Sequence, residues 1–205
     1  PWYGLRRLLA PVSVWLVDEG LSGLRLHLAN DLPDPLIASL RVALWAPDGT
    51  TMGSVSLRVA VDGHTTLERS VDRMFEGFRD LTYAYRFGPP AHDVVLVELA
   101  AGPSHPSSRA FFLPLGSARP RIPDCGLIAS ARQLGDRWSL LVTTAAFAHY
   151  VNVVIAGFEP SDNWFHLEPG GRAEITLRPT GSRARPTGEV RALNSVLAAT
   201  VDLPE

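Results

Sequence analysis

The sequence predicts an all-β protein: two tandem Ig-like antiparallel β-sandwiches, preceded by a short N-terminal helix. Three observations support this prediction. Apolar residues alternate with polar or small ones in many short segments, as in "GLRLHLAN", where Leu24, Leu26 and Leu28 share one face. Turn-forming Gly, Pro and Asp-Gly pairs separate these segments at spacings of roughly 8–12 residues. Helical periodicity is confined to the first ten residues.

Residues 1–11 are predicted to form an amphipathic helix that ends at Pro11. A helix of one or two turns is marginal by itself, so we expect its apolar side to dock on another part of the protein. That side consists of Trp2, Leu5, Leu8 and Leu9.

Residues 12–118 are predicted to form the first sandwich. Beyond "GLRLHLAN", strands are expected in "SLRVALWAPDG", "SVSLRVAVDG", "LTYAYRF" (81–87), "VVLVELA" (94–100) and "RAFFLPL" (109–115). The Asp-Gly pairs at 48–49 and 62–63 are turn signals typical of hairpins. Seven or so short strands at this spacing favour a sandwich or a barrel.

Residues 119–205 are predicted to form a second, smaller sandwich. The segment "GSARPRIPDCG" (116–126) lacks periodicity and is interpreted as a stiff connection between the two domains. Strand patterns then resume in "RWSLLVTT", "HYVNVVIAGF", "WFHL", "AEITLRP" and "GEVRAL".

Composition excludes several classes of protein. The hydrophobic fraction of 46% argues against disorder, and the net charge of −2 without a basic block argues against nucleic-acid binding. No apolar run reaches the roughly 20 residues of a membrane span. The single cysteine, Cys125, is expected to be buried, and with no visible signal peptide it favours a cytoplasmic location. Because the chain begins at proline, we expect a fragment or a processed product.

Catalytic and metal chemistry find little support. A catalytic pair of carboxylates would have to be held roughly 5–10 Å apart in a cleft, but one candidate alternates outward on its strand and the others flank turns. The six histidines share no short motif. The turns at 30–34 and 161–163 could offer oxygens to calcium, but simple Asx-turns are more common. No cofactor and no catalytic residue are predicted. The carboxylates considered for a catalytic pair are Glu98, Glu159, Glu168 and Glu174.

Aromatic residues are the candidates for contacts with a sugar or another domain. Trp164, Trp138 and Trp45 are singled out, and Trp15 is also eligible, although a buried ring is the more common outcome. In "SDNWFHLEPGG" (161–171) we expect a polar turn whose side chains satisfy backbone groups. Strand alternation would then send Phe165 and Leu167 into the core and Trp164 to the outer face.

Two stretches resemble the C-terminal region of family 2 glycoside hydrolases, most closely the β-mannosidase branch. The first spans residues 2–45, where a short helix runs through "APV" into a sandwich whose second strand ends in "ND". The second is "SDNWFHLEPG" (161–170), preceded by "YVNVV" (150–154). The matching residues are Trp2, Tyr3, Leu5, Arg7, Ala10, Pro11, Val12, Asn30, Asp31, Ser161, Asp162, Asn163, Trp164, Phe165, Leu167, Pro169 and Gly170.

This resemblance implies non-catalytic sandwiches downstream of a (β/α) barrel that carries the chemistry. No Asn-Glu dipeptide, the family's acid/base motif, occurs in the chain, and 205 residues of strand pattern cannot hold a barrel of roughly 250 residues. The expected partner is therefore an upstream catalytic domain, with terminal β-linked mannosides or related sugars as the substrate of the longer protein. The alternative is a carbohydrate-binding module that holds oligosaccharide through exposed aromatics. An Ig-like adhesion or assembly domain is a third interpretation.

Overall fold

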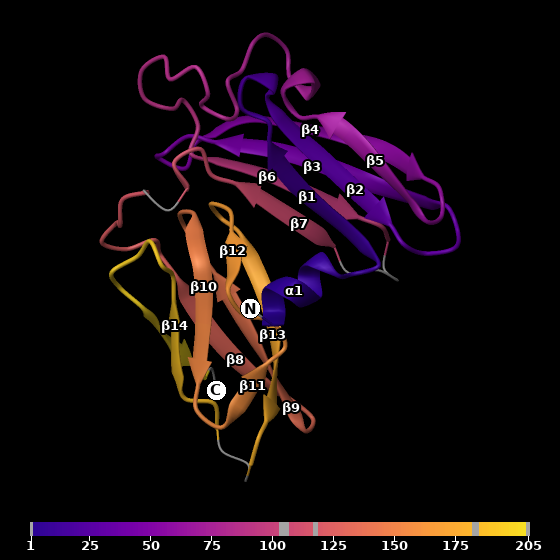
Figure 1. The fold of residues 1–205 in the computed structure, drawn as a ribbon. Coiled ribbons are helices and arrows are strands. Elements are labelled where there is room, and N and C mark those ends of the chain that lie inside the picture. The colour runs from indigo at the N-terminus through magenta and orange to yellow at the C-terminus, as the bar shows by residue number, and fades with distance from the viewer. Residues whose placement is uncertain (1, 103–106, 117–118, 182–184, 204–205) are drawn as a thin grey trace. The chain divides into compact units, whose positions relative to one another are not determined.

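The computed structural model describes residues 2–102, 107–116, 119–181 and 185–203. It confirms the all-β class with one short N-terminal helix (Figure 1). The chain folds into two compact units, residues 1–117 (unit 1) and 118–205 (unit 2). Residues 117 and 118 of the expected interdomain connection lie outside the described part.

The described residues of unit 1 form helix α1, seven strands and two short 3-10 helices. Their bounds are α1 Trp2–Leu8, β1 Val12–Asp18, η1 Gly20–Ser22, β2 Leu24–Asn30, β3 Leu36–Trp45, β4 Thr51–Val61, β5 Thr65–Ser70, η2 Asp72–Met74, β6 Val94–Ala100 and β7 Ser108–Phe112.

The strands of unit 1 form a sandwich of a three-stranded sheet, β1-β2-β5, and a four-stranded sheet, β4-β3-β6-β7. All neighbours in both sheets are antiparallel. The alternation in β2 works as expected: Leu24, Leu26 and Leu28 are buried, while the residues between them are half-buried. Their side chains meet those of β3 and β6, such as Leu40 and Val97, in one core.

Two expectations for unit 1 were wrong. Residues 81–87 form no strand, because local hydrogen bonds and left-handed residues hold this segment as a loop. The Asp62-Gly63 pair closes no hairpin: β4 pairs with β3 while β5 pairs with β2, so this turn carries the chain from one sheet to the other. The Asp48-Gly49 turn does close the β3–β4 hairpin, with the Thr50 amide donating to Asp48 Oδ1 over 2.9 Å.

Eight strands make up the sheet of unit 2 within its described residues. Their bounds are β8 Ile128–Leu134, β9 Arg137–Thr143, β10 Ala148–Ile155, β11 Phe158–Pro160, β12 Phe165–Leu167, β13 Arg172–Pro179, β14 Gly188–Arg191 and β15 Ala199–Asp202.

These strands run in the order β11-β13-β9-β8-β15-β14-β10-β12. One core cluster draws on strands near both ends of this order, including Leu140, Leu177, Val151 and Leu167, so the sheet folds over on itself as a sandwich. The pair β15–β8 is parallel, which departs from the all-antiparallel expectation. The last strand thereby links the first strand of the unit to β14.

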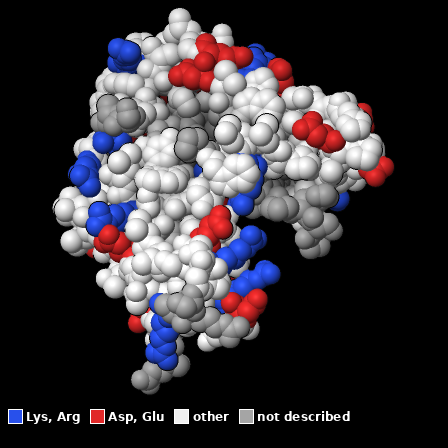
Figure 2. All heavy atoms as spheres, turned by 60° about the horizontal axis from the view of Figure 1, so that its bottom comes forward, with Lys and Arg blue, Asp and Glu red and all other residues white. Residues whose placement is uncertain are grey.

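Helix α1 matches the sequence prediction and ends before Pro11, but it buries none of its residues. No helix in the described ranges is long and apolar enough to cross a bilayer. On the face shown in Figure 2, basic and acidic side chains are interspersed.

Candidate functional site

The polar turn at residues 161–163 of unit 2 satisfies backbone groups, as predicted. Ser161 Oγ accepts the Thr176 amide over 2.9 Å, and Asp162 Oδ1 accepts the Asn163 amide over 2.8 Å. The Asn163 amide group is buried and pairs with β10 as a strand would, because Oδ1 accepts the Val153 amide (2.9 Å) and Nδ2 donates to the Val153 carbonyl (3.0 Å). These oxygens are occupied by the fold, as in an ordinary Asx-turn.

The aromatic pair that follows this turn divides as expected, but for a different reason. Phe165 is 8% exposed and Leu167 is fully buried in the core, whereas Trp164 is 47% exposed. Trp164 lies outside β12 and has a φ of 59°. Its outward direction therefore comes from a left-handed backbone conformation and not from strand alternation. Its amide donates to the Val151 carbonyl over 2.8 Å, which fixes the turn against β10.

A cluster of rings lies where β10 meets β12. A bulge in β10 puts Tyr150 at a φ of 47°, and its ring stacks on His149 with centroids 4.4 Å apart. His166 of β12 lies 4.9 Å from His149 and 4.6 Å from Tyr150, again between centroids. The Tyr150 amide donates to His166 Nδ1 over 3.0 Å, so a neutral His166 carries its proton on Nε2. The pairing of β10 with β12 thus brings together His149 and His166, which share no sequence motif.

Burial and the nearby Arg119 guanidinium lower the pKa of His149, which keeps this imidazole neutral. Arg119 itself lies over the Phe147 ring at 4.6 Å. The Asn194 side-chain amide holds the start of β10: its Oδ1 accepts from the His149 amide and its Nδ2 donates to the Phe147 carbonyl, both over 2.8 Å. This cluster is a packed support for β10, because Asn194 and the ring contacts hold the His149 segment in place.

The other tryptophans named from the sequence lie in different settings. Trp45 is 4% exposed, so its ring has no open face for a sugar. Trp138 is half-buried and packs against the core of unit 2, and Trp15 stacks on His27 with centroids 5.1 Å apart. The apolar side of α1 is open among the described residues, with Trp2, Leu5, Leu8 and Leu9 between 52% and 79% exposed.

The candidate carboxylates serve structural roles where their contacts are known. Glu98 bridges Arg41 and Arg109 at 3.5 and 3.4 Å on the β3-β6-β7 surface. Glu174 accepts a hydrogen bond from Ser139, which together with Arg132 lowers the pKa of its carboxyl group. Glu159 lies on β11 and Glu168 directly follows β12.

The groups considered from the sequence as metal ligands are dispersed or bonded within the fold. Within the described ranges, no three His, Cys, Asp or Glu residues are grouped as a metal site. Asn30 is fully buried: its Oδ1 accepts the Leu32 amide, and its Nδ2 faces the carbonyls of Val61, Asp62 and Asp34. Cys125 is buried, as predicted.

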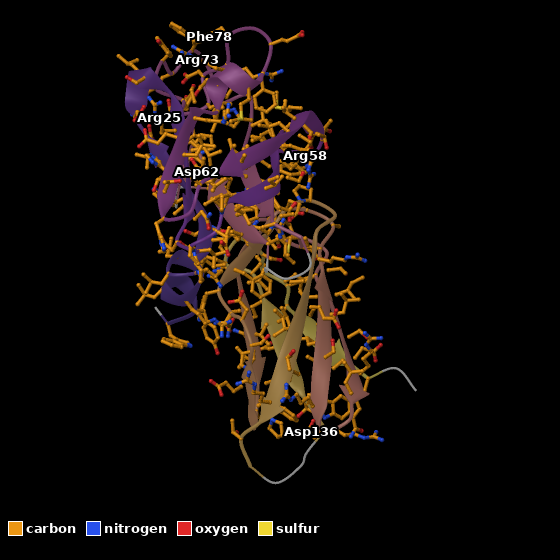
Figure 3. All side chains as sticks on the ribbon, turned by 90° about the vertical axis from the view of Figure 1, so that its right-hand side faces the viewer. Arg25, Arg58, Asp62, Arg73, Phe78 and Asp136 are labelled. Carbon is orange, nitrogen blue, oxygen red and sulfur yellow. The ribbon has the colours of Figure 1, made fainter. Side chains whose placement is uncertain are left out.

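The most exposed group of aromatic residues was not predicted, and it lies on the long loop between β5 and β6 of unit 1. Phe78, Tyr85 and Phe87 are 74%, 42% and 83% exposed, and we call these three rings the aromatic ridge. Tyr85 contacts Phe78 edge-on (5.4 Å between centroids) and stacks on Phe87 (5.8 Å). Phe78 projects at one end of unit 1, as does Arg73 (Figure 3).

Two cavities of about 260 Å³ each adjoin the aromatic ridge. Both are lined by Phe78, Arg79 and Asp80. The first also contacts Phe87 and the second also contacts Tyr85. Each cavity therefore combines side chains of the ridge with polar groups.

The loop that carries the ridge is held by its own hydrogen bonds. Asp80 accepts the amides of Ala84 and Tyr85, each over 2.9 Å, and the Tyr83 hydroxyl donates to the Gly88 carbonyl over 2.7 Å. Tyr83 and Arg86 adopt left-handed backbone conformations, with φ of 57° and 55°. These features explain why the strand-like spacing of residues 81–87 was misleading.

His92 closes the base of the first cavity. It is 5% exposed, and its Nε2 lies 3.0 Å from the Leu81 carbonyl. Burial lowers the pKa of this imidazole, so it is neutral and donates from Nε2.

Comparison of the sequence with protein families and with curated proteins found no match. Comparison with solved structures found a β-D-mannosidase from Dictyoglomus thermophilum that is similar over 100% of this chain, with a TM-score of 0.69 and 13% identity. The chain spans 23% of the length of that enzyme. At this identity the likeness concerns the fold.

Two further structures are similar over most of the chain at much lower scores. A red sea bream transglutaminase matches 96% of this chain and 31% of its own (TM-score 0.33, 13% identity). The E. coli chaperone DraB matches 93% of this chain and 95% of its own (TM-score 0.33, 14% identity). Neither score supports an inference about this protein.

Proposed function

We propose that this chain is the non-catalytic C-terminal accessory region of a β-mannosidase-like glycoside hydrolase. The observation that carries the proposal is the similarity of the whole chain to less than a quarter of the D. thermophilum β-mannosidase. An enzyme of that size has room for a catalytic domain in the remainder. In this proposal the longer protein hydrolyses terminal β-linked mannosides or related sugars, and the two units support or shape its catalytic domain.

The open apolar side of α1 supports the same proposal. Its four apolar residues are more than half exposed, and a seven-residue helix is not stable without tertiary contacts. An upstream catalytic domain would bury this side. Unit 1 and unit 2 would then follow as supports for that domain.

The native product of the gene tests this proposal. We expect a protein far longer than 205 residues that hydrolyses a chromogenic β-mannoside, whereas the 205-residue chain alone does not. In the long protein, the double variant Leu5→Asp/Leu8→Asp should lower the thermal midpoint, while Leu21→Asp, an exposed leucine on η1, should not. A native protein of about 205 residues, or equal midpoints for the two variants, would overturn the accessory role.

A carbohydrate-binding module is the second candidate, favoured by the exposed aromatic side chains. Trp164 is about half exposed, and the rings of the aromatic ridge are 42% to 83% exposed. Titration of the chain with oligosaccharides, followed by tryptophan and tyrosine fluorescence, tests this candidate independently of the gene product.

A further inference from the structure

We propose that the aromatic ridge of unit 1 is the binding site for a neutral oligosaccharide. This inference deepens the carbohydrate-binding candidate and assigns it to the β5–β6 loop, away from Trp164 and Trp138. Three features carry it: the exposure of the rings, the rigidity of the loop and the polar groups in the adjoining cavities.

Exposure of the rings comes first. Phe78 and Phe87 are 74% and 83% exposed, although burying a phenylalanine side chain stabilises a protein by roughly 1.5–3 kcal/mol. The two rings contact Tyr85 and leave their other faces open to solvent. The apolar C–H face of a sugar ring fits such an aromatic face, while its hydroxyl groups remain at the edge for hydrogen bonds.

The loop holds these rings in place before any ligand arrives. Asp80 fixes the amides of Ala84 and Tyr85, and the Thr82 hydroxyl donates to the Gly20 carbonyl over 2.9 Å. At the start of the loop, Asp72 Oδ2 accepts the Leu24 amide over 2.7 Å. A site that is already ordered loses less conformational entropy on binding.

Among the described residues that line the cavities, one buried donor lacks an acceptor, whereas the Asp80 carboxylate is occupied. The oxygens of Asp80 accept backbone amides, but Arg79 Nε is buried and has no acceptor among the described residues. The Arg79 guanidinium lies over the Phe75 ring at 5.2 Å, which fixes its position. A sugar hydroxyl at this point would accept the unsatisfied N–H group.

Charge and size favour a neutral, extended ligand over an anion or an apolar protein segment. Residues 72–93 contain three arginines against three aspartates and one glutamate, so the loop has no net positive charge. Each cavity, at about 260 Å³, is smaller than the roughly 300–1,000 Å³ pockets that enclose a drug-sized ligand. Because Phe78 lines both cavities, a short sugar chain bound at this ring would adjoin both of them.

Calorimetric titration of the 205-residue chain with mannotriose, cellotriose, N-acetylated chitotriose and trigalacturonate tests the inference. We expect at least one neutral trisaccharide to bind. Phe87→Ala should weaken it about 2- to 12-fold, the equivalent of one aromatic contact. Phe78→Ala/Phe87→Ala should abolish detectable binding and Phe87→Trp should retain it. Phe87→Leu, which keeps apolar area but lacks a ring face, should weaken binding as much as Phe87→Ala does.

Matched controls separate the ridge from other surfaces. Ile37→Ala, an exposed apolar residue on β3, and Trp164→Ala should leave the affinity unchanged, while Arg79→Lys, which removes Nε, should weaken it. Near-UV circular dichroism checks that each variant is folded.

Four outcomes would overturn the inference: no binding of any neutral trisaccharide at about 10 mM, binding insensitive to Phe87, binding of trigalacturonate alone, or dimerisation that Phe87→Ala abolishes. None of these touches the accessory proposal, which depends on the gene product.

Discussion

Residues 71–93 of unit 1 and residues 161–167 of unit 2 are both rich in aromatic side chains, and each combines a polar anchor with a left-handed residue. In unit 2 the anchor, Asn163, bonds to the neighbouring strand β10, and Phe165 enters the core directly afterwards. In unit 1 the anchor, Asp80, bonds to amides of its own loop. Phe78 and Phe87 stay outside.

The difference teaches that the partner of the anchor decides whether the aromatic rings become core or surface. A side chain bonded to a strand brings the next residue into register with the sheet. A side chain bonded to its own loop stabilises a conformation that is independent of the sheet. The predictions below challenge this comparison, from the largest effect to the smallest.

Truncation of Phe165 in unit 2 should destabilise the protein strongly, whereas truncation of Phe87 in unit 1 should hardly change its stability. Phe165→Ala should lower the free energy of unfolding by about 3–5 kcal/mol, because it leaves a cavity in the unit 2 core. Phe165→Leu should cost much less. Phe87→Ala, the matched change on the loop, should alter stability by less than about 0.5 kcal/mol. Urea unfolding of the chain measures all three, and a negligible shift for Phe165→Ala would contradict the assignment of this ring to the core.

Removal of the anchors should also differ, by a smaller margin. Asn163→Ala leaves the buried Val153 amide and carbonyl without partners and should cost about 1–3 kcal/mol. Asp80→Ala frees two amides that water can reach, so we expect about 0.5–1 kcal/mol together with faster hydrogen exchange of Ala84 and Tyr85. Equal costs for the two variants would show that the anchors play the same role.

A pH titration compares the buried histidines of the two units, His92 and His149. Burial lowers the pKa of both imidazoles, so the unfolded chain binds more protons than the folded chain as the pH falls below the ordinary value of 6.5. The free energy of unfolding should therefore decrease from pH 7 toward pH 5. It should level off once the pH is below the folded pKa values.

The carboxyl groups with lowered pKa values do not contribute to the change in unfolding free energy between pH 7 and pH 5. Glu19, Asp48 and Glu174 lose their contributions only when the pH falls below their ordinary values of 4.5, 3.8 and 4.5. His149→Gln should reduce the slope between pH 7 and 5, and the His92 contribution should persist. Urea midpoints that stay constant across this range would count against both burial assignments.

Most of the strands could be predicted because every second side chain along them is buried, as in β2 and the first half of β3. β5 was missed because it is an edge strand whose residues are exposed or half-buried, so it shows no alternation. Residues 81–87 were misassigned for the converse reason. Leu81, Tyr83, Tyr85 and Phe87 recur at every second position, but the bonds of Asp80 that fold the loop leave no trace in that period.

The candidate sites depended even more on contacts that are distant in sequence. The turn at 161–163 was predictable, because its polar side chains act within a few residues or on the adjacent strand. The convergence of His149 and His166 follows from the register of β10 with β12. The buried Nε–H group of Arg79 lacks an acceptor in the described part of the chain because of how the loop packs around it. Neither can be read from local pattern.

The parallel pairing of β15 with β8 determines when each unit can fold during synthesis of the chain. All the described strands of unit 1 have been made once residue 112 is synthesised, so this unit can fold while translation continues. Unit 2 must wait, because its first strand pairs with residues 201 and 202. Until they leave the ribosome, β8 and β14 both present unpaired edges to other nascent chains. Unit 2 is therefore the half of the molecule that should most need a chaperone during synthesis.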